Sequence, residues 1–476
     1  MTGFMRKATA AVCVFGLTWA GTIAYWRQTG STPSGLEILT LLGLVPAGVL
    51  GGGWMLRALA LRTAERAAAH IAQPDDESAP TSATSSAETV ALAPGLAVLA
   101  AEVRLPDVAT PPVLLTRPMT APRPGLHPQL KDHDGLPVFA GFVADLPDPR
   151  SAESDTSIAP RFSRVLALLE SILDELTVQV AQALPALPVV EERVVAGWRQ
   201  QRAQEVTRAL MVECLVDADM PAVLRTHLHE ALSQRLQTAG LDTRRYSVEV
   251  IPVADAGQVW ERLRRLSDDD ASAPCWHLLL SGCSAIDPRV IERWQAQGRL
   301  YRSAQADGRV PGESAAGVLL ANAAAVRGQA YARLQPPLCV EVSAASAMPI
   351  AQRARLSTQL AGQTLDASAL APQAVGFVIS DAGTQEGLTS ETGQVAHTLC
   401  PDLDIGTQCL PLATSTGALE LSAPLVLLAL AHAQLQQSGQ AVLLLGIDLP
   451  DRRWASVLHP SPLPETLVRP EAAAAA

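Results

Sequence analysis

Apolar positions change their spacing repeatedly from about residue 161 onward. Helical spacing over 162–183 predicts a helix that ends at Leu184-Pro185. The continuous apolar run at 275–280 predicts a strand covered on both faces of its sheet. The same patterns predict further strands at 209–216, 246–253, 315–321, 339–343, 374–379, 441–447 and 454–458, and helices at 222–239, 257–266, 288–297, 352–360, 390–399 and 419–437.

The order of these elements occurs twice, in residues 161–330 and again in residues 331–465. Leu278-Leu-Leu-Ser-Gly ends one series and Val442-Leu-Leu-Leu-Gly ends the other. Alternating strands and helices favour parallel pairing, because parallel strands need a crossover helix between them. The pattern therefore predicts a duplicated α/β layered sandwich of mostly parallel sheets.

The N-terminal region has a different pattern. Residues 8–26 and 38–56 carry no charge, and each stretch is long enough to span a bilayer core. Arg6 and Lys7 precede the first stretch and arginines follow the second, so residues 1–66 are predicted to form a transmembrane hairpin with both ends in the cytoplasm. The expected location is a bacterial inner membrane, with the main body cytoplasmic. A signal peptide cleaved near Ala24 and a pair of core helices are the alternatives.

Three further segments complete the predicted organisation. Residues 67–91 are polar, small and proline-bearing, as in a disordered linker, and residues 466–476 are predicted to be a disordered tail. Residues 92–160 are rich in proline and short apolar runs. They are predicted to form a small cap or an extension of the main body, with short strands at Pro112-Val-Leu-Leu and at 136–143.

Charge and composition exclude several functions. The net charge is −11 and aromatic residues make up 4% of the 476 residues, which argues against a nucleic-acid partner. The chain has no phosphate-cradling or dinucleotide-binding glycine motif, so no cofactor is predicted. No metal site is predicted either. His227 and His229 are two positions apart on a helix and face different sides, and no cysteine pair has zinc-ligand spacing.

One motif carries a resemblance. Arg309-Val-Pro-Gly-Glu-Ser-Ala-Ala-Gly-Val-Leu-Leu, followed later by Ser415-Thr-Gly-Ala-Leu-Glu-Leu-Ser-Ala-Pro before a long apolar helix, resembles the thiolase-like superfamily, which includes the β-ketoacyl synthases. The likeness covers roughly residues 200–460. It implies that Pro311, Gly312, Glu313 and Gly417 are fold-signature residues, with Glu313 bonding backbone amides near a turn.

The departures from that superfamily concern its chemistry. The resemblance implies a nucleophilic cysteine at a helix N-terminus and two histidines in loops of the second half. The matching segments 251–260, 380–386 and 410–417 contain no cysteine and no histidine, and Asp255 would raise the pKa of a thiol there. No catalytic residue is therefore predicted, and the chain is expected to be a pseudoenzyme.

A second resemblance concerns function. Arg123-Pro-Gly-Leu-His-Pro-Gln-Leu and Asp132-His-Asp-Gly-Leu-Pro-Val-Phe-Ala-Gly, together with the N-terminal spans, are similar to membrane-anchored type VI secretion adaptors that load lipase toxins. This implies a protein partner, either the toxin or a spike protein. One alternative is an acyltransferase with a relocated nucleophile, Cys283 or Ser281, and another is a structural envelope component that self-assembles. The sequence does not indicate an oligomeric state.

Overall fold

A computed structural model describes residues 95–146, 159–185, 192–195, 198–201, 208–268, 273–303, 305–326, 329–342, 348–385 and 387–461. The predicted transmembrane hairpin, the linker and the C-terminal tail lie outside these residues. Among the helices that are described, none is both long and apolar enough to cross a membrane.

The first half contributes five strands to the main sheet, in the order β7-β6-β8-β9-β1. β6 (Leu210–Asp217) pairs in parallel with β7 (Tyr246–Val253) and with β8 (Trp276–Ser284). β9 (Glu313–Ala321) runs antiparallel between β8 and β1 (Leu96–Arg104). All nine residues of β8 and of β9 are buried, which explains why apolar side chains dominate both strands.

The second half repeats this order as β13-β12-β14-β15-β11. β12 (Val375–Ser380) pairs in parallel with β13 (Cys409–Pro411) and β14 (Ala441–Gly446). β15 (Arg452–Pro460) runs antiparallel between β14 and β11 (Leu338–Glu341). In each half one strand, β9 or β15, runs against the other four, and the strand order is duplicated as predicted. The prediction of mostly parallel sheets is wrong: the sheet is mixed, with four parallel and six antiparallel strand pairings, because each of these reversed strands pairs antiparallel on both sides and β10 adds two further antiparallel pairings.

A short strand joins the halves. β10 (Ala332–Leu334) pairs antiparallel with β1 on one side and with β15 on the other. The two predicted sheets therefore form one eleven-stranded sheet. β1 belongs to the 92–160 segment, so this part of the segment extends the main body as a central strand.

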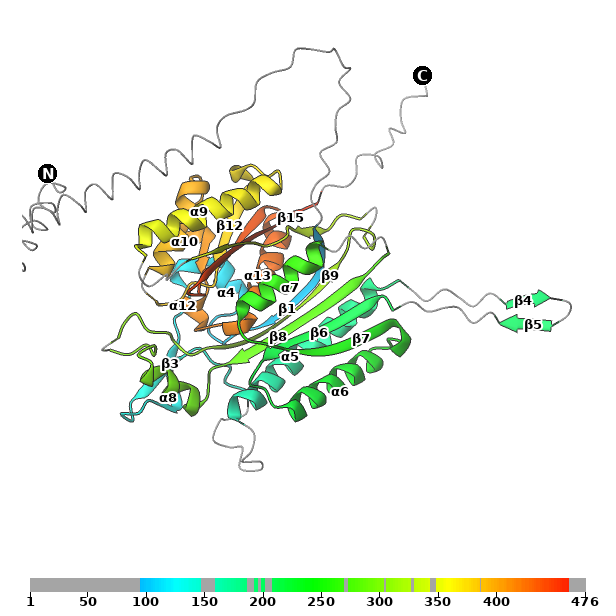
Figure 1. The fold of residues 1–476 in the computed structure, drawn as a ribbon, viewed down its shortest axis with the longest axis horizontal. Coiled ribbons are helices and arrows are strands. Elements are labelled where there is room, and N and C mark those ends of the chain that lie inside the picture. The colour runs from blue at the N-terminus through cyan, green and yellow to red at the C-terminus, as the bar shows by residue number, and fades with distance from the viewer. Residues whose placement is uncertain are drawn as a thin grey trace, which may run out of the picture. The chain divides into compact units, whose positions relative to one another are not determined.

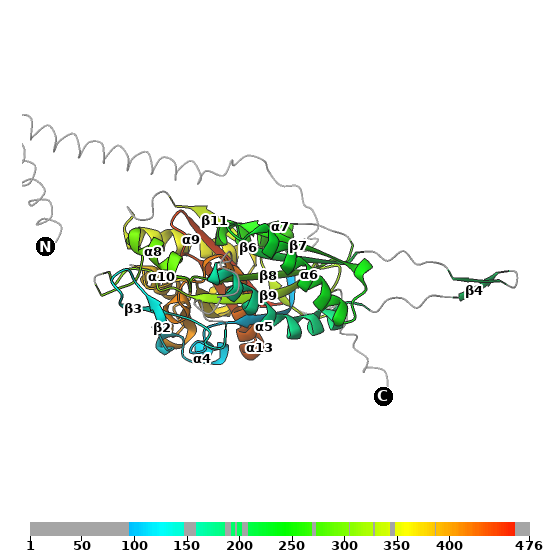
Figure 2. The same cartoon turned by 90° about the horizontal axis from the view of Figure 1, so that it is seen from below.

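Helices fill three layers around the two ends of this sheet (Figures 1 and 2). α5 (Pro160–Ala183) and α6 (Ala222–Thr238) share one apolar core with the first half. α9 (Ile350–Ala367) and α10 (Leu388–Leu399) share another with the second half. α7 (Ala256–Asp268) and α13 (Ala423–Ser438) pack between the halves and bury residues of both. Because α7 and α13 pack against strands of both halves, the two ends of the one sheet form two layers. The order of layers is helix, sheet, helix, sheet, helix.

The remaining elements are short. α8 (Pro288–Ala296) packs against the hairpin of β2 (Gly125–Lys131) and β3 (Pro137–Ala140), and β4 (Glu192–Val195) pairs with β5 (Trp198–Gln201). α11 (Ile405–Gln408) and α12 (Ala413–Thr416) flank β13. The prediction of a short strand at Pro112-Val-Leu-Leu is wrong. The segment forms α4 (Pro111–Thr116), because a proline at the first helical position needs no hydrogen-bonded N–H and Leu114 and Leu115 reach the core.

Candidate binding cavity

The structure brings the fold-signature residues of the two motifs together. Gly141 N–H donates to Pro311 O at 2.9 Å, and Ala418 N–H donates to Val310 O at 2.8 Å. A Cβ at Gly312 would lie 2.7 Å from backbone atoms of 416–418, and a Cβ at Gly417 would lie 2.5 Å from Pro311 O. Gly417 also has φ +73°. Two backbones therefore cross at a separation that only glycine permits.

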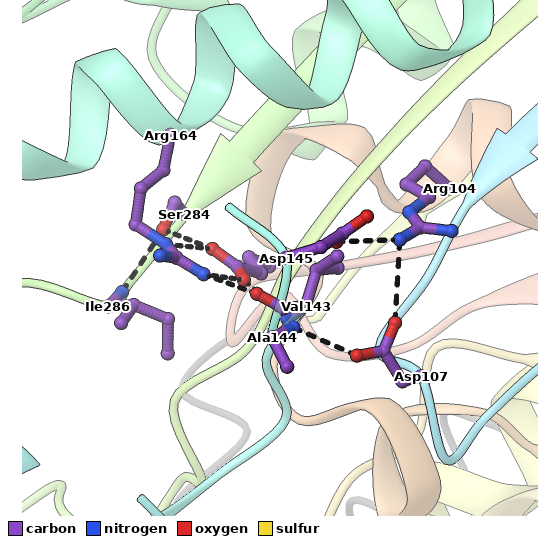
Figure 3. Close-up of polar contacts among 9 residues, drawn as sticks. Arg104, Asp107, Val143, Ala144, Asp145, Arg164, Ser284 and Ile286 are labelled. Atoms are coloured by element: carbon purple, nitrogen blue, oxygen red, sulfur yellow. Dashed lines mark hydrogen bonds and ion pairs between the residues drawn. The ribbon is translucent and has the colours of Figure 1, made fainter. Parts of the chain in front are cut away.

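Glu313 follows this crossing and is fully buried. Its carboxylate accepts from Arg164 Nη2 at 2.5 Å and Nε at 2.8 Å, from Ser284 Oγ at 2.9 Å and from the Val143 N–H at 2.7 Å. Arg164 also donates to Val143 O at 2.9 Å (Figure 3). The carboxylate does bond a backbone amide, but that amide belongs to the distant 141–146 segment, which this ion pair fixes to α5 and β9.

The 141–146 segment is bound on its other side as well. Asp107 accepts from the Ala144 N–H at 2.8 Å, and Arg104 contacts Asp107 at 3.4 Å and Asp145 at 2.9 Å (Figure 3). These last contacts are largely exposed, so each contributes less than about 1 kcal/mol. The buried Glu313 network is the stronger of the two attachments.

A cavity of about 470 Å³ opens beside this network. Its walls come from the ends of β6, β8, β12 and β14, from the starts of α5 and α7, and from α8 and the loop that follows it. The lining residues are Arg161, Phe162, Val165, Asp217, Met220, Ala254, Asp255, Ala256, Gly282, Cys283, Ser284, Ala285, Val290, Arg293, Trp294, Arg299, Arg309, Asp381, Glu420, Leu421, Asp448, Leu449, Pro450 and Asp451.

The cavity lining includes residues of two of the three segments in which the superfamily resemblance implies a nucleophile or a histidine, and none of the third, 410–417. Ala254, Asp255 and Ala256 come from the junction of β7 and α7, and Asp381 comes from the loop after β12. Glu420 follows Gly417 by three residues. The lining contains no histidine and one cysteine, Cys283. Instead of a thiol, Asp255 stands before α7 and accepts from the Gln258 N–H at 3.1 Å.

Cys283 is buried and hydrogen-bonded. Its thiol donates to Leu419 O at 2.8 Å and lies 3.2 Å from Ser422 Oγ. Burial raises the pKa of this thiol to about 11. Ser281, the other candidate nucleophile, is fully buried, does not line the cavity, and has a hydroxyl without a hydrogen-bond partner in the described structure. The Cys283 thiol is therefore mostly protonated at neutral pH.

Asp381 is the most buried acid in the cavity wall, at 3% exposure. Its Oδ1 accepts from the N–H groups of Ile447 at 2.7 Å and Asp448 at 3.0 Å, which ties the end of β12 to the end of β14. Burial first, and then the negative charge of Asp448, raise the pKa of Asp381 to about 7. This carboxyl is therefore partly protonated near neutral pH.

Arg309 carries the main positive charge at the cavity. It pairs with Asp448 and, at 3.1 Å, with Glu420, and its guanidinium lies 5.3 Å above the Trp294 ring. Burial lowers the pKa of Arg309, but the two carboxylates more than offset this, so the pKa is raised. Arg309, Asp381, Glu420 and Asp448 were all missed as site residues at the sequence level. The sequence offered one signal for two of them, because Asp381 and Asp448 come just after the buried apolar runs of β12 and β14.

Other predicted features lie elsewhere. His227 and His229 are exposed on α6. Within the described residues, no three histidine, cysteine or acidic side chains could hold a metal ion together.

Comparisons with known proteins give the fold. No protein-family model and no curated protein sequence matches. The oxazolomycin ketosynthase domain from Streptomyces albus superposes with a TM-score of 0.50 at 13% identity, over 78% of this chain and 75% of that one. The module 1 ketosynthase of the bacillaene synthase from Bacillus amyloliquefaciens gives 0.46 at 13% identity, over 80% and 75%. The acyltransferase ChlB3 gives 0.42 at 12%, over 77% and 98%. The body therefore has a thiolase-like, ketosynthase-type α/β fold.

Proposed function

We propose that this body acts by binding at its cavity rather than by acyl transfer through a cysteine. The observation that carries the proposal is the state of Cys283, the one thiol in the cavity wall. It is buried, donates to a carbonyl and keeps its proton, since its pKa is about 11. Asp255 stands where the superfamily resemblance implies a nucleophile, and a carboxylate at that position opposes thiolate formation.

The narrower form of the proposal is a membrane-anchored adaptor for type VI secretion, which binds a lipase-type toxin or a spike protein. It rests on the resemblance at residues 123–130 and 132–141. This segment includes β2 and β3, where Leu126 faces Phe139 across the hairpin. Leu126 is 52% exposed, Leu136 60% and Phe139 39%. An apolar outer face on a hairpin is typical of a protein-binding surface.

Acyl transfer is the second candidate function. The solved structures that share the fold are named as ketosynthases and an acyltransferase, and this favours the candidate at the level of class. It would require Cys283 or Ser281 to react. Self-assembly as an envelope component is the third candidate, and neither the fold nor the cavity singles it out.

Covalent capture separates the first two candidates. The full-length chain is incubated with acyl-coenzyme A and acyl-carrier thioesters, and its intact mass is measured. Binding without acyl transfer predicts no added acyl mass. An adduct that disappears in Cys283→Ala would instead establish acyl transfer.

Affinity capture from the native host tests the adaptor form. The full-length chain is used as bait and is compared with its Leu126→Asp/Phe139→Asp double variant, called the hairpin variant. Val223→Asp, at a position 78% exposed on α6, is the matched control. Retention of a lipase-like toxin or spike protein by the wild type and the control, and its loss from the hairpin variant, is the expected result. Equal capture by all three baits would contradict a role for the hairpin.

A further inference from the structure

β11 has an open edge. It pairs with β15 on one side, and no other described strand pairs with it. The Val342 N–H donates to Asp451 O at 2.7 Å, so alternate residues of β11 bond β15, and the N–H and C=O groups of Cys339 and Glu341 point away from β15. An edge with unpaired backbone groups is a template for one more strand.

The first residue of β1 lies close to this open edge. β10 and β11 follow one another along the same side of β15, where Leu334 pairs with Leu458 and Leu338 pairs with Ala455. On the other side of β10, Leu96 of β1 pairs with Leu334. Because β1 runs antiparallel to β10, the residues that precede β1 continue along the outer edge of β11.

The pairings give these preceding residues a register. Along β15, the sheet advances by three positions from the last residue of β10 to the first residue of β11. The residue three positions before Leu96 therefore falls opposite the first residue of β11. Leu92 then falls opposite Cys339. Two positions further back, Val90 falls opposite Glu341.

Backbone directions agree with this register. The Gln335 N–H donates to Val457 O at 3.0 Å, so Gln335 bonds β15 and its neighbour Leu334 bonds β1. Leu96 lies opposite Leu334 and therefore points its N–H and C=O groups toward β10. Every second residue before Leu96 points the same way, and Leu92 is one of them. Leu92 can thus exchange two hydrogen bonds with the residue opposite it on β11.

Side-chain faces agree as well. Leu96 belongs to the same apolar core as Trp454, which lies beside Cys339 in the ladder. Side chains alternate along a strand, so Leu92 shares the face of Leu96. On this face a groove of about 480 Å³ lies between α7 and β11, and Cys339 and Trp454 are among the residues that line it. An apolar side chain at position 92 is suited to this groove.

We propose that residues 90–93, which precede the described residues, add a strand to the open edge of β11 and place Leu92 in the groove beside α7. Their sequence, Val-Ala-Leu-Ala, is apolar and uncharged. Pro94 falls at the break between β10 and β11, where Pro336-Pro337 already interrupts the ladder. The added strand closes an edge that could otherwise pair with another chain. The inference does not depend on the proposed binding function.

Disulfide formation in the full-length chain tests the strand. Cys339 is a free, exposed thiol. Residues of a hydrogen-bonded antiparallel pair have Cα atoms about 5.5 Å apart, which suits a disulfide. Under mild oxidation, Leu92→Cys should form a bridge to Cys339, identified by peptide mass mapping. It should form at least tenfold faster than with Ala91→Cys or Ala93→Cys, whose side chains face the other side of the sheet. Ser82→Cys, in the polar segment, controls for chance encounters.

Two disulfide results would overturn the proposal. Absence of the bridge would refute the strand. Equal rates at positions 91, 92 and 93, or a faster rate at 91 or 93, would refute the register. Hydrogen exchange is a second measurement. Leu92→Pro should speed exchange of the Cys339 and Glu341 amides at least tenfold, and Ser82→Pro should not. Unchanged exchange in Leu92→Pro would contradict the strand as directly as a missing bridge.

Discussion

In each half a buried ion pair holds the start of the strand that runs against the others, β9 in the first half and β15 in the second. The two pairs place their positive and negative partners in opposite ways. In the first half the strand residue is Glu313 on β9, and Arg164 comes from a helix. In the second half the strand residue is Arg453 on β15, and Glu391 comes from α10 with its carboxylate 2.7 Å from Arg453 Nε. All four side chains are at most 3% exposed. The repeated topology thus preserves a buried ion pair at this point but not its polarity.

The pairs also differ in what they hold. Each glutamate accepts from one serine, Ser284 or Ser357. Only Glu313 also accepts from a distant segment, through the Val143 N–H. The first pair therefore attaches a chain segment to the body, whereas the second pair fastens helices to a strand within one half.

The largest expected effect is the loss of either buried pair. Glu313→Gln and Glu391→Gln should each lower the free energy of unfolding by about 3–5 kcal/mol, because a buried arginine is left without its counter-charge. Urea denaturation measures the loss. Glu261→Gln is the control, since Glu261 is 29% exposed and pairs with Arg264 at the surface, so it should cost less than about 1 kcal/mol.

Limited proteolysis then separates the two halves. Cleavage near residues 141–146 should accelerate in Glu313→Gln and stay at the control rate in Glu391→Gln, because Glu313 and Arg164 both bond the Val143 backbone and Glu391 does not. Equal acceleration in both variants would show that the segment depends on global stability and not on the first pair.

The crossing of 310–312 with 416–418 joins the halves and gives the next largest effect. Gly417→Ala should destabilise by more than about 2 kcal/mol, because a Cβ would lie 2.5 Å from Pro311 O and the residue has a positive φ. Gly439→Ala is similar in φ, at +68°, but its ψ is 3° where Gly417 has −177°, and it has open space around it, so its cost should stay at about 1 kcal/mol. Thermal unfolding of both variants gives the difference. Similar losses would mean that the close crossing adds nothing to the cost of a positive φ.

Local patterns predicted the fold well because its strands are buried on both faces. The apolar runs of β8, β12 and β14 are visible in the sequence, and the turn around Pro311 and Gly417 carries recognisable glycines. The pairing of β1 and β10 could not be read, since β1 pairs with a strand more than two hundred residues away. The cavity charges were equally hidden, because Arg309, Asp381 and Asp448 meet only through the sheet topology.

The last expected effect depends on pH and concerns the ends of β6 and β12, where Asp217 and Asp381 lie. Asp217 is 36% exposed and paired with Arg161, whereas Asp381 is 3% exposed. The folded state binds a proton at Asp381 more tightly than the unfolded state does, because the pKa is raised from 3.8 to about 7. Stability should therefore fall as the pH rises from about 4 to 7, by at most about 1.4 kcal/mol per pH unit for one proton.

Asp381→Asn should remove this slope, since the amide resembles the protonated acid and its oxygen can still accept from the Ile447 and Asp448 N–H groups. The variant should match the wild type near pH 4 and exceed it in stability at pH 8. Asp217→Asn should keep the wild-type slope. The midpoints of urea unfolding, measured for the three proteins between pH 4 and pH 8, give the slopes to be compared. An unchanged slope in Asp381→Asn would mean that the pH dependence comes from other groups. Asp381 and Asp217 would then differ in burial but not in how strongly they bind a proton.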